Sequence, residues 1–593
     1  MTLSSAVSEK RHILTIAMED YFHVGAFNQF IQRERWYRFP TRFEENTRKA
    51  LDLLDRFQVK ATFFVLGWIA DKQPDIVKEV VRRGHEVASR GYYHRSIRQM
   101  TREEFREDLT RARDALERAS GAQVLGYRLA HQWLTPTDLW ALDVLAEEGY
   151  AYDSSILPSR RMFQAEKNSR FVHRHRCGSH EIWEVPLSTW SVAGWNVPIA
   201  GGNYFRQFPH TFIKRAVKHW HETYAAPFVM YFHVWELDPD QPNIDAASPL
   251  ARIRHYRNLD KMRWVLEDYL STYRFAGVAE ILGITPHVIE TPHIEVRTTV
   301  ATAKENERYD GGTHRDGQQR VPVSVVIPCF NEELILPYLA NTLRSMEETL
   351  GRDYDLCFIF VDDGSSDGTW NALRRMFAEQ ENCTILRHPQ NRGVAGAILT
   401  GIHAATTDIV CSIDCDCTYD PHELRNMIPL LTDGVDLVTA SPYHPQGKVL
   451  NVPAWRLCLS KVASFLYRCV IPRRLATYTS CFRVYRKSAI LGLPLTEQGF
   501  LGIAELIGQL GLRNAEIVEY PAVLEVRVLG HSKMKVLRTI RGHLRLLTRL
   551  LLQRIFNRDT QASAQNSLSH SLPSNRACVA GPAISPTKES LHE

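Results

Sequence analysis

Short apolar runs alternate with amphipathic stretches along most of this chain. In the first half, residues 13–16, 61–66 and 228–232 are apolar runs typical of buried strands, and residues 102–120 carry a helical period. In the second half, residues 323–327, 356–361 and 408–413 predict three more strands. This alternation predicts an α/β fold for both halves.

The pattern breaks at a polar segment that divides the chain in two. Residues 285–320 contain prolines, glycines and many charges without any period, so we interpret them as a linker. We therefore predict a first domain over 1–284, a second over 321–529, a basic amphipathic segment over 530–558 and a disordered tail over 559–593. The tail is predicted from its richness in Ser, Ala and Asn.

Composition narrows the possible classes of protein. The 593 residues are 44% hydrophobic and carry a net charge of +5, values that exclude a disordered chain and argue against a nucleic-acid-coated surface. We find no secretory signal and no apolar run long enough for a transmembrane helix. Sparse cysteines suggest free thiols in a reducing compartment, so we expect a cytoplasmic protein.

Carboxylates follow the three predicted strands of the second half. Asn331 and Glu332 follow the first strand, Asp362 and Asp363 the second, and an Asp-x-Asp pair the third. Strand ends are where open α/β sheets bind ligands. Asp414 and Asp416 could hold a divalent cation, which would neutralise a leaving diphosphate. Taken alone, each of these polar clusters could belong to an ordinary turn. Their order and spacing after three successive strands indicate a binding site more specifically than any single cluster does.

These motifs resemble glycosyltransferase family 2 over residues 322–554, especially its dolichol- and polyprenyl-phosphate sugar transferases. The resemblance implies a GT-A doubly wound nucleotide-sugar domain that uses Mg²⁺ or Mn²⁺ at Asp414 and Asp416, with Asp416 also catalytic. The donor would be a nucleotide-diphosphate sugar. The implied donor-binding residues are Pro328, Asn331, Glu332, Asp362, Asp363, Asn391 and Gly393.

The resemblance also implies a site for a polyprenyl-phosphate or glycan acceptor. An arginine fork suits a phosphate group. Glu505 is a candidate base, although an anionic acceptor would need little help and a helix-surface Glu is the alternative. The implied acceptor-phosphate residues are Arg456, Ser460, Arg483, Arg527 and Lys533.

The segment 530–558 combines basic residues with an apolar helical stripe and has no acidic residue. Such a helix can lie in a bilayer interface, so we expect a protein peripheral to the inner face of the cell membrane. The alternative is a helix that docks on its own domain and leaves its charges in water. The basic residues are Lys533, Lys535, Arg538, Arg541, Arg545, Arg549, Arg554 and Arg558.

The first half resembles the polysaccharide deacetylase (NodB-like) family, in its exopolysaccharide-associated branch, which implies a distorted (β/α) barrel. The matching stretches include residues 19–23, 61–67, 84–89, 126–128, 152–155, 184–186 and 231–233. Family members use a catalytic Asp and a metal held by an acidic residue and two His. Here the catalytic Asp is replaced by Ala17 and the first His by Arg90, and a guanidinium cannot bind a cation.

We therefore predict a degenerate deacetylase site that has lost metal-dependent hydrolysis and serves as a glycan-binding or assembly module. Arg90 is predicted to pair with Glu19. The alternative site uses Glu19 as base and Asp20 as ligand, completed by His131 or His23. The residues of the degenerate site are Ala17, Glu19, Asp20, Arg90, His94, Arg128 and His233.

The sequence thus predicts a glycosyltransferase of cell-surface or exopolysaccharide synthesis. One alternative is a bifunctional enzyme that also N-deacetylates the polysaccharide or its lipid-linked precursor. Another is a non-catalytic glycan-binding protein, which the intact Asp clusters of the second half disfavour.

Overall fold

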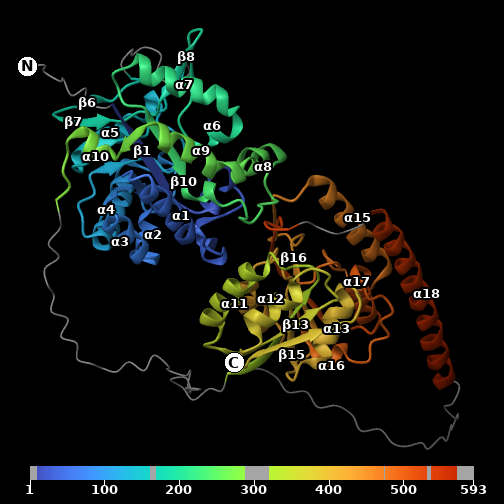
Figure 1. Cartoon of the computed structure of the whole chain (residues 1–593). Coiled ribbons are helices and arrows are strands. Elements are labelled where there is room, and N and C mark those ends of the chain that lie inside the picture. The colour runs from blue at the N-terminus through green and yellow to red at the C-terminus, as the bar shows by residue number, and fades with distance from the viewer. Residues whose placement is uncertain (1–9, 160–168, 288–319, 473, 531–535, 570–593) are drawn as a thin grey trace, which may run out of the picture.

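A computed structural model describes residues 10–159, 169–287, 320–472, 474–530 and 536–569, with side chains from 540 to 556 in the last segment. Both halves are α/β, as predicted (Figure 1). The predicted linker lies largely outside the described residues.

The first half is built on a nine-stranded sheet ordered β10-β1-β2-β3-β4-β5-β7-β6, with β11 also paired to β1. Among the described strands only the β6–β7 pair of this sheet is antiparallel. The end strands β10 and β6 are not paired with each other, so the barrel is open on that side. The strands are β1 Arg11–Met18, β2 Thr62–Val65, β3 Glu86–Ser89, β4 Gly126–Tyr127, β5 Tyr152–Asp153, β6 His173–Cys177, β7 His180–Glu184, β10 Val229–His233 and β11 Arg274–Ala276, with a separate hairpin of β8 Thr189–Val192 and β9 Trp195–Pro198.

Helices between these strands supply the outer layer. The predicted helix over 102–120 is α4, which begins at a capping box of Thr101 and Glu104 and ends at the left-handed Gly121. The helices are α1 Phe43–Arg56, α2 Gly67–Lys72, α3 Pro74–Arg82, α4 Arg102–Ser120, α5 Trp140–Glu147, α6 Gly202–Gln207, α7 His210–Thr223, α8 Pro249–Tyr256, α9 Leu259–Thr272 and α10 Val278–Leu282.

The second half is a doubly wound sheet ordered β14-β13-β12-β15-β18-β16-β19. Strand β18 runs antiparallel to both of its neighbours. Along β12, Val323, Val325 and Ile327 face one core cluster and Val326 the other, as a strand buried on both faces requires. The strands are β12 Val321–Cys329, β13 Tyr354–Asp362, β14 Cys383–Arg387, β15 Ile409–Ser412, β16 Leu437–Ser441, β18 Arg483–Arg486 and β19 Ile517–Pro521, with β17 Lys448–Leu450 paired to β20 Val523–Glu525.

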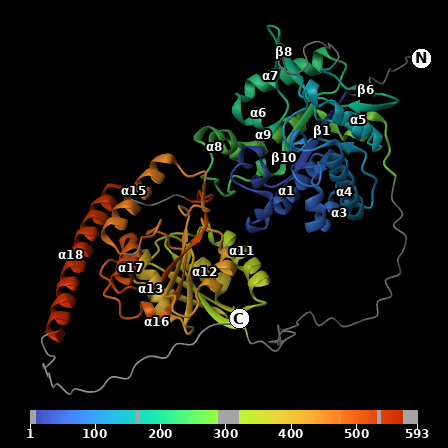
Figure 2. The same cartoon turned by 180° about the vertical axis from the view of Figure 1, so that it is seen from behind.

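Helices cover both faces of this sheet, and the long α18 runs along its outer side away from the first half (Figures 1 and 2). Helix α18 continues to Ser569, into the tail predicted to be disordered. Residues 559–569 include Ala and Gln and neither Gly nor Pro, a composition that permits helix. The helices are α11 Leu336–Leu350, α12 Thr369–Phe377, α13 Val394–Ala404, α14 Leu424–Met427, α15 Ala454–Val470, α16 Lys487–Ile490, α17 Phe500–Leu512 and α18 Val536–Ser569.

The two halves share one apolar core cluster. Phe39 of the first half meets Tyr338 of α11 edge to face, with ring centroids 5.0 Å apart. The first-half members of this cluster are Tyr21, Phe22, Phe27, Ile31, Trp36, Phe39, Trp235, Ile244, Ala247 and Leu259. The halves therefore form a continuous interface as well as being joined by a linker.

Candidate functional site

Three strand ends of the second sheet meet at one edge. Cys329 at the end of β12 is in register with Asp362 of β13, and Ser412 at the end of β15 is in register with Val326. The loops that follow line a cavity of about 1090 Å³. The predicted residues that line it are Pro328, Glu332, Asp363, Asn391, Gly393, Asp414, Asp416, Arg456, Ser460 and Arg527.

Asp363 organises the loop that enters α13. Its carboxylate accepts hydrogen bonds from Asn391 Nδ2 at 2.9 Å and from the backbone N–H groups of Arg392 and Gly393 at 2.8 and 2.7 Å. His388 Nδ1 lies 2.7 Å from the same carboxylate. Most of the acceptor capacity of Asp363 is therefore used within the loop. Sequence reasoning missed His388, which has no motif around it.

Asn331 and Asp362 shape neighbouring turns without lining the cavity. Asn331 adopts a positive φ of 53°, and its Oδ1 accepts the Ser366 N–H at 2.7 Å. Asp362 is fully buried, with Arg387 Nε at 3.0 Å and the Ser365 N–H at 3.0 Å. These two residues stabilise the turns beside the cavity through hydrogen bonds to backbone N–H groups.

The Asp-x-Asp pair carries excess negative charge. Burial and the neighbouring Asp416 raise the pKa of Asp414 to about 7. Arg527 gives partial compensation, since its Nη1 lies 3.5 Å from Asp416 Oδ2 and its Nη2 pairs with Glu332. Within the described residues, no group of three or more His, Cys, Asp and Glu side chains is placed to hold a metal ion.

Arg456 and Ser460 of α15 form another part of the cavity wall. The guanidinium of Arg456 lies 5.2 Å from the ring of Trp455, and its buried Nε has no hydrogen-bond partner among the described residues. A buried donor without a partner is costly, so this wall favours an anionic ligand.

Two further predicted residues, Arg483 and Glu505, do not line the cavity. Arg483 is fully buried and donates to the carbonyls of Ile503 and Tyr478 at 3.0 and 3.1 Å. Glu505 is also fully buried; it accepts from Thr496 and Glu497 and pairs with Arg549 Nη2 at 2.7 Å. Glu505 thus joins α17 to α18 and does not face the acceptor side. Lys533 lies outside the described residues.

In the first half, Glu19 forms the centre of a closed cluster. Its Oε2 lies 2.9 Å from Arg90 Nε and 3.3 Å from His94 Nε2, and its Oε1 lies 2.7 Å from His233 Nδ1. Burial would raise the pKa of Glu19, but Arg90 and His233 hold it well below its ordinary value. The predicted Glu19–Arg90 pair is confirmed.

The other predicted residues of that site have structural partners. Asp20 accepts three backbone N–H groups, from Tyr21, Arg42 and Phe43, so its oxygens are not free for a metal. His23 Nδ1 in turn accepts the Asp20 N–H at 2.9 Å. Arg128 is buried and bonds Thr15 and Ser154. Ala17 is buried on β1. The alternative metal site, in which Asp20 is the acidic ligand, therefore lacks a carboxylate that is available for a metal ion.

Three family descriptions match parts of the chain. Polysaccharide deacetylase matches residues 35–139, Domain of unknown function (DUF3473) matches residues 154–283, and Glycosyl transferase family 2 matches residues 324–492. The first two matches cover the half that contains the Glu19 cluster, and the third covers the strand ends around the large cavity.

Known proteins match parts of the chain. A dolichol-phosphate mannosyltransferase from Pyrococcus furiosus is 29% identical over 231 residues, which are 39% of this chain and 63% of that protein. A polyprenol monophosphomannose synthase from Mycolicibacterium smegmatis is 28% identical over 221 residues, 35% of this chain and 80% of that protein. A solved putative polysaccharide deacetylase from Mycobacterium smegmatis covers 48% of this chain and 96% of its own, at 19% identity and a TM-score of 0.33.

Proposed function

The chain joins a polysaccharide deacetylase domain to a family 2 glycosyltransferase domain, and we propose that it transfers a sugar from a nucleotide-diphosphate donor to a polyprenyl phosphate or a related glycan acceptor. The observation that carries this proposal is that one cavity gathers most of the predicted donor and acceptor residues. The names of the two relatives support a lipid-phosphate acceptor.

The donor side fits a divalent cation, Mg²⁺ or Mn²⁺. Asp414 and Asp416 would hold it, because their mutual repulsion is relieved by a positive charge, and the donor's diphosphate would complete its oxygen ligands. When bound, the cation supplies charge neutralisation for the departing diphosphate. Arg527 adds a fixed positive charge at the same place.

The acceptor side fits an anionic phosphate. Arg456, whose buried Nε has no hydrogen-bond partner among the described residues, and Arg527 both line the cavity and would offer N–H donors to a phosphate. A phosphate acceptor is already an anion, so no enzyme base is required. The engagement of Glu505 with α18 is consistent with this mechanism.

Helices α15 and α18 suit a membrane surface. They contact each other, and α18 packs inward through Leu546, Leu547 and Leu550. Arg549 and Arg554 tie α18 to its own domain, whereas Arg541 and Arg545 are exposed. Among the described residues no helix combines the length and hydropathy of a bilayer span. The exposed apolar residues of the two helices are Trp455, Val462, Phe465, Ile540, Leu544, Leu551, Leu552, Ile555 and Phe556.

This surface leads us to place the protein at the inner face of the membrane, in cell-surface or exopolysaccharide synthesis. There the exposed apolar residues would enter the interface and the arginines would meet anionic headgroups. The first half would serve as a glycan-binding or assembly module. It would not hydrolyse its ligand, because Arg90 takes the place of a metal-ligating His and pairs with Glu19.

The test is a donor screen with the full chain, Mn²⁺ or Mg²⁺, and vesicles that contain polyprenyl phosphate. We expect one nucleotide sugar to deliver its sugar to the lipid fraction. No turnover with any donor in the presence of the lipid would overturn the proposal.

The same vesicles test the membrane surface. Replacing Phe465 and Phe556 by Ser removes about 2 kcal/mol of transfer free energy for each inserted ring. We therefore expect co-sedimentation with anionic vesicles to weaken at least tenfold. Trp264→Ser, which removes a 55% exposed ring from α9, is the matched control and should change nothing. Equal binding by both variants would exclude this surface.

A further inference from the structure

We propose that the deacetylase-type half is a working part of the transferase site, in which Arg35 and Arg38 position the loop of Asp414–Asp420 and the loop that carries Arg527. This inference rests on the proposed function of the second half. It assigns to the first half a role that does not depend on hydrolysis or on a bound glycan.

Arg35 and Arg38 lie on the long segment that connects β1 to α1. The chain leaves β1 at Glu19 and returns to α1 at Phe43. Asp20 joins the two ends of this segment. One of its carboxylate oxygens accepts the Tyr21 N–H at 3.0 Å, and the other accepts the Arg42 and Phe43 N–H groups at 2.7 and 3.1 Å. Residues 21–42 are thereby held as one unit.

Arg38 anchors the loop after the Asp-x-Asp pair. Its Nη2 lies 2.8 Å from both carboxylate oxygens of Asp420, and Arg38 itself is only 2% exposed. The carbonyl of Arg38 accepts Asn341 Nδ2 of α11 at 3.2 Å. Because Asp420 follows Asp416 by four residues, this ion pair, in which Arg38 is buried and the Asp420 side chain is 26% exposed, fixes the far end of the loop that carries both carboxylates.

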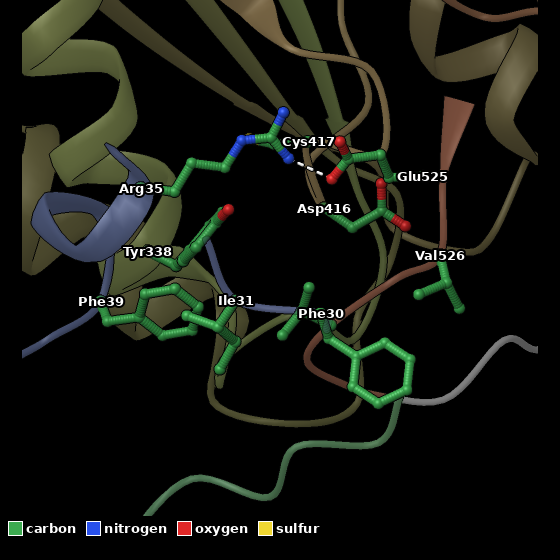
Figure 3. Close-up of a pocket in the computed structure, with 10 residues that line it drawn as sticks. Phe30, Ile31, Arg35, Phe39, Tyr338, Asp416, Cys417, Glu525 and Val526 are labelled. Carbon is green, nitrogen blue, oxygen red and sulfur yellow. Dashed lines mark hydrogen bonds and ion pairs between the residues drawn. The ribbon is translucent and has the colours of Figure 1, made fainter. Parts of the chain in front are cut away.

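Arg35 anchors the second loop. It pairs with Glu525 at the end of β20, two residues before Arg527 (Figure 3). The Glu525 N–H donates to the Thr418 carbonyl at 3.0 Å, which links this strand to the Asp-x-Asp loop. Arg35, Asp416 and Glu525 line one small pocket between the halves. Arg35 therefore joins the two loops on which the donor side depends.

A backbone contact holds the same loop just after Arg527. Ile244 of the first half forms an antiparallel bridge with Leu529, and the Asp245 N–H donates to the Val528 carbonyl at 2.9 Å. Asp245 and Ala246 also line the large cavity beside Arg527. The first half thus supplies part of the cavity wall and holds the loop on both sides of the arginine.

The structure offers a matched control on the same 3-10 helix, η3 (Arg33–Arg38). Arg33 pairs with Glu34 at the surface, with side chains 40% and 66% exposed, and exposed pairs contribute little to stability. Arg33→Gln and Arg35→Gln thus remove the same charge from one short helix, but only the second removes a contact to the transferase loops.

The decisive measurement is hydrogen–deuterium exchange of the full chain without ligands. For Arg35→Gln we expect exchange over residues 525–530 to rise at least about tenfold, which is 1.4 kcal/mol of local opening. Glu525→Gln should do the same, and the double variant should be no worse than either single variant, because both remove one pair. Arg35→Lys, which keeps the charge, should recover part of the protection.

Unchanged exchange over 525–530 in Arg35→Gln, or an equal rise in Arg33→Gln, would overturn the inference. Donor turnover is the second readout: we expect kcat/KM of Arg35→Gln to fall about 10–100-fold, as for other residues that orient a metal site. If the unaltered chain turns over no donor, the proposed function fails, and the exchange measurement still decides whether Arg35 positions the loops.

Discussion

Two carboxylate sites at strand ends in this chain have opposite surroundings. Glu19 in the first half is closed by Arg90, His94 and His233, all within 3.3 Å. Asp414 and Asp416 face a cavity of about 1090 Å³ with one guanidinium at 3.5 Å. Arg90 gives the first carboxylate a built-in counter-charge, whereas the second pair leaves room for charges that a ligand brings. Neighbouring charge, more than the carboxylates themselves, separates a structural site from a binding site.

The largest expected effect comes from removing the charge of Glu19, the carboxylate that Arg90, His94 and His233 enclose. Glu19→Gln leaves the buried Arg90 without its counter-charge, and we expect a loss of about 3–5 kcal/mol in the free energy of unfolding at pH 7. Glu280→Gln breaks the exposed pair with Arg11 and should cost less than about 1 kcal/mol. Calorimetric unfolding of the full chain measures both. Equal losses of stability would contradict the idea that the buried Glu19–Arg90 pair matters more than the exposed Arg11–Glu280 pair.

The same variant has a defined pH dependence. Because the folded-state pKa of Glu19 lies below its ordinary value, the stabilisation is present above that ordinary pKa, about 4.3. It is lost as the pH falls through the folded-state pKa. The stability difference between the unaltered chain and Glu19→Gln should therefore begin to shrink just below the ordinary pKa and continue to shrink as the pH falls through the folded-state pKa.

The next effect concerns catalysis at the open pair. Asp416→Asn should lower donor turnover by at least about 100-fold, because an amide cannot replace the negative charge that holds a cation. Stability should not fall, since repulsion with Asp414 is removed. Asp355→Asn on the exposed end of β13 is the control. Turnover that survives Asp416→Asn would remove the mechanism proposed here.

The smallest expected effect is a partial conversion of the closed site into an open one. Ala17→Asp combined with Arg90→His restores the residue types of the deacetylase pattern around Glu19 and His94. We expect Zn²⁺ affinity to rise at least about tenfold over the unaltered chain, and to be lost when His94→Ala is added. Zn²⁺ titration by calorimetry measures this. No gain would mean that the backbone has moved away from ligand geometry.

The sequence predicts the strands and the Asp-x-Asp site because both are local patterns. Apolar runs followed by carboxylates place Asp363 and Asp414 at one sheet edge without further information. The direction of a side chain is not a local pattern. Arg483 and Glu505 match motifs by spacing, yet both point into the core, where backbone groups and Arg549 meet them.

Long-range pairs are also absent from the local pattern. Arg38 and Asp420 are 382 positions apart, and no pattern around either residue indicates that the other is its partner. Asp20 follows a motif for metal binding, but its oxygens accept the N–H of the next residue, Tyr21, and the N–H groups of Arg42 and Phe43 from a returning loop. Only the tertiary fold shows that this loop returns.

The shared apolar cluster limits how this gene can be divided or recombined. A break within residues 285–320 would leave Phe22, Phe39 and Tyr338 on newly exposed surfaces of the two fragments. Exposed patches of that kind promote aggregation. Exchange of one half between related chains would succeed only when the contact residues of both halves travel together.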